Sequence, residues 1–238
     1  MPLSNKPATK KITKKPIKVS LCFDRGAKRR FQLRLLKWYA EYGRDLPWRR
    51  TSDPYKILVS EVMLQQTQVD RVIPKYHEFL QRYPTLKDLA KAAPEKVRQT
   101  WFPLGYNVRP YRLHSIACEA VEQYGGQIPR DAEKLQAMKG IGRYTAGAVR
   151  SFAFNEDAPI LDTNVIRVLH RVFLAEGDPK TQKTKLWAMS EALIPKGKRY
   201  DFNQALMDFG AIVCTARKPY CLLCPMRDFC KAYPVEGR

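Results

Sequence analysis

The sequence lacks any run of about eighteen apolar residues, which is the length that a membrane-spanning helix requires. It also lacks the apolar core of a secretory signal peptide, because residues 1–20 carry six lysines in its place. These absences argue against a membrane protein and against secretion by that route. We therefore expect a soluble, intracellular protein without a membrane partner.

Acidic residues are scarce. The chain has 23 Asp or Glu against 43 Lys or Arg, for a formal net charge of +20. The excess is strong in residues 1–27, which are rich in Lys, Pro and Thr and show no apolar periodicity, so a disordered basic arm is predicted there. A charge of this size is compatible with a solvated surface. It also favours a polyanionic partner, and nucleic acid is the commonest one inside a cell.

Strand-like alternation is missing as well, and no internal repeat is present. From about Phe31 the apolar residues follow a helical period, so the predicted fold class is all-α. The length of 238 residues suffices for one large domain or two helical lobes. The expected helices cover residues 31–42, 57–72, 76–82, 85–91, 94–101, 109–124, 131–138, 143–154, 162–174, 182–193 and 202–213.

A turn with two glycines joins two of these expected helices. Its sequence is Lys139-Gly140-Ile141-Gly142, and the next helix begins at Arg143. The glycines allow positive φ and a close approach to a ligand, and free N–H groups at the start of a helix favour an anion. The turn therefore predicts a phosphate site to which Lys139 and Arg143 add charge. An ordinary packing corner between two helices is the alternative.

Two carboxylates stand in unusual surroundings. Glu61 lies at the edge of the apolar face of the expected helix 57–72. Burial there would raise its pKa and suit a general acid, whereas a solvated helix residue is the alternative. Asp162 precedes Thr163 at the start of another helix, where it caps that helix and the local N–H groups keep it ionised. An acid of raised pKa opposite an ionised carboxylate is the arrangement that cleaves glycosidic bonds.

Four of the six cysteines lie close together near the C-terminus. They are Cys214, Cys221, Cys224 and Cys230, separated by six, two and five residues. In an intracellular protein this crowding indicates metal or cluster ligands more than disulfides. Four thiolates can bind a [4Fe–4S] cluster or a structural zinc ion, and the single C-x2-C pair favours the cluster modestly.

Together and in this order, these features resemble the endonuclease III-like superfamily of DNA glycosylases. The resemblance spans about residues 31–234 and is closest to the MutY adenine glycosylases, with the thymine–mismatch glycosylases as near relatives. It implies a two-lobed helix-hairpin-helix fold with a C-terminal cluster loop. A six-helix lobe would cover about 53–157, and a cluster lobe 28–52 plus 158–238. The matching stretches are LPWR (46–49), DPYKILVSEVMLQQTQV (53–69), GIGRYTAGAV (140–149), ILDTNVIRVL (160–169) and FNQALMDFGAIVC (202–214).

The resemblance implies roles for individual residues. Glu61 matches the glutamate that protonates the departing base, and Asp162 matches the aspartate that stabilises the cationic sugar or attacks it. Gln66 matches a glutamine that fills the hole left by the flipped base, and Tyr106 matches a tyrosine that wedges near the opposing base. Tyr144 stands where bifunctional relatives carry a Schiff-base lysine, so strand cleavage through an imine is not expected.

The same resemblance implies a cofactor and a partner. The four cysteines match the ligands of a [4Fe–4S] cluster, and the turn of residues 139–143 matches a DNA-binding hairpin. The expected partner is double-stranded DNA that contains a mismatch or a damaged base, bound by a monomer. The expected location is the cytoplasm of a prokaryote, in association with the nucleoid.

The expected function is hydrolytic removal of adenine opposite guanine or 8-oxoguanine, without lyase activity. The Gln65-Gln66-Thr67 stretch is of the adenine type. Asn107 replaces the second tyrosine of the usual Gly-Leu-Gly-Tyr-Tyr, and Tyr144 is closer to the thymine–mismatch relatives. Release of thymine or uracil from T·G or U·G mismatches is therefore the alternative. A non-catalytic iron–sulfur DNA-binding module is the alternative from another class.

Overall fold

The computed structural model describes residues 23–235, and within them it contains helices and no strand, which confirms the predicted all-α class. The basic arm falls outside the described residues as far as residue 22. The described part has eleven α-helices and two 3₁₀ helices. In chain order they are α1 (Arg25–Tyr42), η1 (Pro47–Arg49), α2 (Pro54–Met63), α3 (Val69–Arg82), α4 (Leu86–Lys91), α5 (Pro94–Trp101), α6 (Val108–Gln123), α7 (Ala132–Ala137), α8 (Arg143–Phe152), α9 (Thr163–Phe173), α10 (Lys183–Leu193), α11 (Arg199–Ile212) and η2 (Cys221–Leu223).

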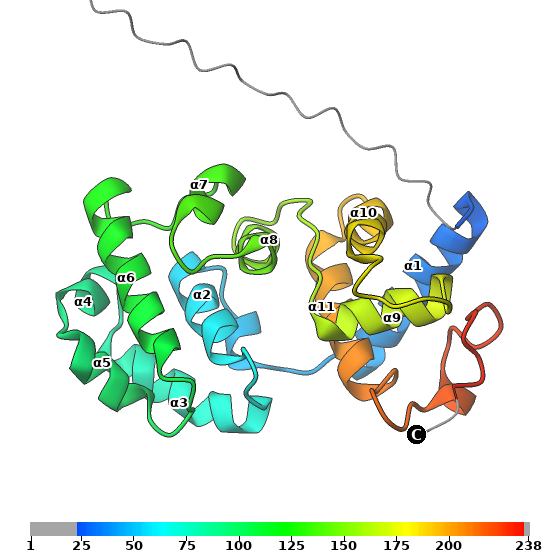
Figure 1. Cartoon of the computed structure of the whole chain (residues 1–238), viewed down its shortest axis with the longest axis horizontal. Helices are drawn as coiled ribbons and strands as arrows, with labels where there is room; N and C mark the ends of the chain where they lie inside the picture. The colour runs from blue at the N-terminus through cyan, green and yellow to red at the C-terminus, as the bar shows by residue number, and fades with distance from the viewer. Residues whose placement is uncertain (1–22, 236–238) are drawn as a thin grey trace, which may run out of the picture.

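The helices form two groups that lie side by side (Figure 1). The first lobe contains α2–α8, with close packing of α4 on α6, of α5 on α6 and of α2 on α8. The second lobe contains α1, α9, α10 and α11, in which α11 packs against both α1 and α9. The chain enters the first lobe through residues 43–53 and leaves it through residues 153–162, and α8 contacts α11 across the boundary.

The predicted end of the basic arm, at residue 27, is too late in the sequence. Helix α1 already begins at Arg25, because the Asp24 carboxylate accepts a hydrogen bond of 2.7 Å from the backbone N–H of Ala27. Just before this cap, the Phe23 ring lies 5.1 Å from that of Phe173 in α9. An apolar contact and an N-cap thus start the helix inside a segment whose composition alone indicates an arm.

The predicted helix 57–72 is also wrong, because it is two helices. Helix α2 begins one residue after its cap Asp53 and ends at Met63, and α3 begins only at Val69. Between them Gln66 adopts a left-handed backbone with φ of 56°. The expected helix 76–82 is the end of α3, which continues through Pro74. The first lobe therefore has seven helices, α2–α8, and not the six implied by the resemblance.

Helix α8 lies against the connecting segment without room for a side chain between them. A Cβ atom on Gly147 would lie 2.2 Å from the carbonyl oxygen of Pro159. Tyr144 precedes this glycine by one helical turn, and Asp162 follows Pro159 by three residues. The close approach therefore sets the spacing between two of the predicted site residues.

A buried ion cluster ties the second lobe to the segment that enters the first. The Asp208 carboxylate of α11 has no exposed surface, and its oxygens accept hydrogen bonds from Arg49 Nη1 at 2.7 Å and from Arg44 Nε at 2.8 Å. Burial alone would raise the pKa of Asp208, but the hydrogen bonds of Arg49 and Arg44 and the charge of Arg49 hold that pKa below its usual range.

We expect Asp208→Asn to lower the free energy of unfolding at pH 7 by about 3–5 kcal/mol, because two guanidinium groups lose their only buried carboxylate. The contribution of Asp208 is present above the ordinary aspartate pKa of about 4 and is lost as the pH falls below it. Urea unfolding measures the change. The control is Asp45→Asn, which breaks an exposed ion pair with Arg50 and is expected to have little effect. Equal effects of the two substitutions would contradict this prediction.

Candidate functional site

A cleft of about 1050 Å³ opens between the two lobes. Its lining includes Glu61 from α2, Gln66 from the turn after α2, and Tyr106 from the loop before α6. Tyr144 from α8 and Asp162 at the start of α9 line it as well. Five residues that are separated by up to a hundred positions in the sequence therefore share one cavity. A site between lobes is the common position for a ligand cleft.

Glu61 is buried in this cleft, with 4% of its surface exposed. Burial raises its pKa to about 7, and the nearby charge of Asp162 adds to the rise. A hydrogen bond with Tyr144 and the charge of Arg49 oppose it. The solvated alternative for Glu61 is therefore wrong. At neutral pH a carboxyl group with this pKa is protonated in part of the molecules, so it can donate a proton.

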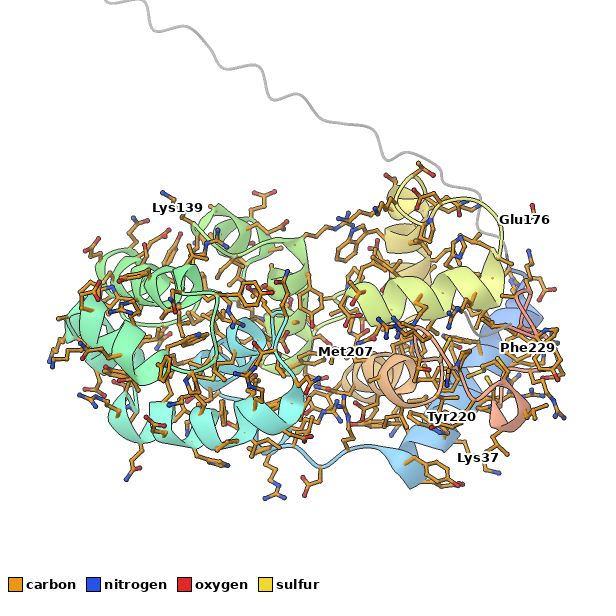
Figure 2. All side chains as sticks on the ribbon, turned by 60° about the horizontal axis from the view of Figure 1, so that its bottom comes forward. Lys37, Lys139, Glu176, Met207, Tyr220 and Phe229 are labelled. Carbon is orange, nitrogen blue, oxygen red and sulfur yellow. The ribbon has the colours of Figure 1, made fainter. Side chains whose placement is uncertain are left out.

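Tyr144 lies close to both carboxylates. It is the second residue of α8, and burial together with the charges of Glu61 and Asp162 raises its pKa well above the usual value. Its hydroxyl also lies 3.5 Å from the Met207 sulfur of α11, and Figure 2 shows Met207 at the junction of the lobes. A phenol with a raised pKa stays neutral and can donate a hydrogen bond. It carries no amine that could form an imine.

Asp162 caps helix α9 as the sequence predicts. Its Oδ1 accepts a hydrogen bond of 2.7 Å from the Val165 N–H, and its Oδ2 accepts one of 3.2 Å from Asn164 Nδ2. Burial raises the pKa of Asp162, whereas these donors and the charge of Arg167 oppose the rise. The carboxylate thus faces the cleft with its negative charge supported from the helix side.

Only one glycine of the turn has the positive φ that the sequence predicts. Gly140 has φ of 110°, whereas Gly142, the N-cap of α8, has φ of −83°, and Ile141 between them is buried. Lys139 is exposed at the outer edge of the first lobe (Figure 2). The guanidinium of Arg143 stacks on the Trp187 ring of α10, 4.1 Å from its centroid. The turn lies outside the cleft lining that contains the carboxylates.

Sequence reasoning missed Gln204 of α11, which also lines the cleft. It is 3% exposed, and its amide oxygen Oε1 has no hydrogen-bond partner among the described residues. A buried unpaired acceptor is costly unless a ligand satisfies it. Gln204 lies inside the FNQALMDFGAIVC stretch. Its neighbour Asn203 also has an unpaired side-chain oxygen, but of the two only Gln204 lines the cleft.

The four C-terminal cysteines surround one cavity in the second lobe, lined by Cys214, Cys221, Cys224 and Cys230 together with Arg171. Arg171 Nη1 lies 3.5 Å from the Cys214 sulfur, and the Met226 N–H lies 3.4 Å from that of Cys224. Such donors stabilise thiolate ligands. Within residues 23–235 no group of three or more His, Cys, Asp or Glu is placed to hold a single metal ion.

Two segments of the chain match known protein families. Residues 59–191 match the HhH-GPD superfamily base excision DNA repair protein family. The chain belongs to this superfamily. Residues 214–230, which contain the four cysteines, match the iron-sulfur binding domain of endonuclease III, and this confirms the predicted [4Fe–4S] cluster. When bound, the cluster cross-links four points of the C-terminal loop.

Individual relatives lie on two branches of this superfamily. The chain is 45% identical over 219 residues to the adenine DNA glycosylase of Rattus norvegicus, which covers 87% of this chain but only 42% of the rat protein. It is 39% identical to the thymine-DNA glycosylase of Aeropyrum pernix, covering 90% of this chain and 98% of that one. A solved structure of a thermostable thymine-DNA glycosylase superposes with a TM-score of 0.82 at 34% identity, over 87% of this chain and 97% of that one.

The comparisons give no support to the expected prokaryotic origin, because the relatives include a mammalian protein. No helix within residues 23–235 is long and apolar enough to cross a membrane.

We expect Glu61→Gln to stabilise the fold, and to do so more at pH 8 than at pH 5. The folded-state pKa of Glu61 is raised to about 7, so ionising the wild-type residue opposes folding as the pH rises from about 4.5 to 7. The difference in unfolding free energy between variant and wild type should grow by roughly 2–3 kcal/mol across this range. Urea unfolding at both pH values measures it, with Glu122→Gln at an exposed position of α6 as the charge control. A difference independent of pH would refute the raised pKa.

Proposed function

We propose that this protein is a monofunctional DNA glycosylase that hydrolyses the N-glycosidic bond of adenine paired with guanine or 8-oxoguanine. The observation that carries the proposal is the pairing of Glu61 and Asp162 in one cleft, with the pKa of Glu61 raised to about 7. Membership of a base excision repair superfamily and 45% identity to a rat adenine DNA glycosylase support it.

The two carboxylates divide the reaction between them. Glu61 donates its proton to a ring nitrogen of the flipped base, so the base leaves as a neutral species. Positive charge then develops on the sugar, and the Asp162 carboxylate stabilises it through proximity and charge. Water then adds to the cationic sugar carbon, and the proton that it releases restores the Glu61 carboxyl group, so the acid is regenerated. Tyr144 has no amine for an imine, which favours simple hydrolysis over strand cleavage.

The unsatisfied Gln204 oxygen supports adenine as the departing base. The amino group of adenine is a hydrogen-bond donor that this acceptor lacks in the free protein. The corresponding edge of thymine offers one donor, N3–H, with a carbonyl oxygen on each side of it. Adenine therefore supplies the hydrogen bond to Oε1 of Gln204 with less competition from neighbouring acceptors.

Release of thymine or uracil opposite guanine is the second candidate. It is favoured by the thymine-DNA glycosylase relative, which this chain covers over 98% of its length, and by the superposition at a TM-score of 0.82. Either reaction requires the same carboxylate pair, so the two candidates differ only in the base that the cleft accepts.

The proposed partner is a duplex that contains the mismatch, bound by one protein molecule. The free N–H groups at the Gly142 cap of α8, together with the exposed Lys139, would bind a backbone phosphate. Arg143 is less available for a phosphate than the sequence indicates, because it stacks on Trp187. Gln66 and Tyr106 would occupy the space vacated by the flipped nucleotide.

A panel of duplexes distinguishes the two base choices. We expect single-turnover release of adenine from A·G and A·8-oxoguanine to exceed release of pyrimidine from T·G and U·G at least roughly tenfold. Strand breaks should form only after alkali treatment, because the enzyme leaves an intact abasic site. Glu61→Gln should retain less than about one hundredth of the rate. Release confined to T·G and U·G would overturn the adenine assignment.

Asp162→Asn separates catalysis from binding. Asparagine caps a helix about as well as aspartate, so the fold of α9 is preserved. We expect base release to fall by roughly 10²–10³-fold, because the cationic sugar loses its counter-charge. Affinity for the mismatched duplex, measured by fluorescence anisotropy, should not weaken, since a negative charge near the phosphates has been removed. A wild-type protein that binds DNA but releases no base would instead be a binding module.

A further inference from the structure

Arg109 in the first turn of α6 is buried at 3% exposure, yet it lines the cleft beside the predicted DNA-contacting residues. Its partners among the described residues are neutral. One amino group, Nη1, donates to the carbonyl oxygens of Val62 at 3.1 Å and Met63 at 2.8 Å, and also to that of Gln65. An arginine with this many buried carbonyl partners is held in one orientation.

The other amino group of Arg109 reaches two loops. Nη2 donates to the hydroxyl of Thr67 at 3.0 Å, and to the carbonyl oxygens of Leu104 at 3.1 Å and Gly105 at 3.2 Å. The first loop joins α2 to α3, and the second precedes α6. One guanidinium therefore connects two loops that are about forty residues apart in the sequence.

Each of these loops carries one strained residue. Gln66 has φ of 56° and Tyr106 has φ of 47°, a left-handed conformation that is unfavourable for residues other than glycine. The hydrogen bonds of Arg109 fall on the groups next to them, at Gln65 and Thr67 around Gln66 and at Gly105 before Tyr106. The Arg109 guanidinium also lies 5.3 Å from the centroid of the Tyr106 ring.

The side chains of these two residues are exposed to solvent. Gln66 is exposed, and 58% of the surface of Tyr106 is exposed at the cleft. Packing in the core therefore does not account for their strained backbones. Here a buried residue holds two strained backbone segments, and both segments place exposed side chains at a cleft. This combination is typical of a preorganised binding surface.

We propose that Arg109 is a positioning residue that fixes Gln66 and Tyr106 as one rigid wedge, and so stabilises the flipped state of the target nucleotide. This inference rests on the proposed glycosylase function. Arg109 itself contacts neither phosphate nor base in this arrangement. It acts by abolishing the freedom of two loops that would otherwise have to become ordered when the duplex is opened.

Arg109→Met tests this directly. Base release under single-turnover conditions should fall by roughly 10- to 100-fold, because the opened duplex loses an ordered wedge that offsets part of the cost of unstacking. Affinity for a fully paired duplex should stay within about twofold, because Arg109 makes no phosphate contact. Arg109→Lys should be intermediate, since an ammonium group can satisfy only part of the acceptor set.

A fluorescent base reports the flipping step itself. In a Glu61→Gln background, 2-aminopurine at the target position opposite guanine should brighten on binding, because unstacking relieves quenching. The double variant Glu61→Gln/Arg109→Met should show a much smaller rise at saturating protein. Arg98→Met is the matched control, because it removes one cation from an exposed ion pair with Glu95 in α5. It should leave release and fluorescence unchanged.

The outcomes are distinguishable. A full fluorescence rise in the double variant, or full base release by Arg109→Met, would overturn the positioning role. If Arg109→Met does not fold, Arg109→Lys and Thr67→Val take its place. Thr67→Val removes a single acceptor, and it should reduce both the fluorescence rise and base release by a smaller factor. If the wild-type protein releases no base from any duplex, the proposed function fails, while the fluorescence comparison still tests the wedge.

Discussion

The Asp208 carboxylate, sealed from solvent between two guanidinium groups, is the interaction on which the cleft depends. It sits on α11 of the second lobe and holds Arg44 and Arg49, which lie where the chain passes into the first lobe. Arg49 in turn lowers the pKa of Glu61 through its charge. A single buried ion cluster therefore sets both the separation of the lobes and part of the electrostatic environment of the acid.

Within the cleft, the ionisation of each group depends on the others. The charge of Asp162 raises the pKa of Glu61, and both carboxylates raise the pKa of Tyr144. Removal of water strengthens these effects, since charges interact more strongly in a medium of low polarity. Protonation of Glu61 and ionisation of Asp162 are thus linked.

The sequence predicts the features that short stretches encode. Helical periodicity indicates the all-α class, the residue before a helix indicates the cap at Asp162, and cysteine spacing with the family resemblance indicates the cluster. The break after Met63 is not predicted, because apolar residues continue with helical spacing through Val69. What ends α2 is a set of carbonyl groups turned toward Arg109, which lies more than forty residues later. The unpaired oxygen of Gln204 is not predicted from the sequence either, because it loses its access to water only when α11 packs in the fold.

The contact between Gly147 and Pro159 has an evolutionary consequence. The distance between α8 and the segment that leads to Asp162 is set by backbone against backbone, with no side chain between them. The spacing between Tyr144 and Asp162 is therefore independent of the side chains that line the rest of the cleft. Descendants of such a chain can exchange those linings, and with them the base that is accepted, while this spacing is inherited unchanged. A lineage in which adenine and thymine enzymes share one scaffold is the expected product of such divergence.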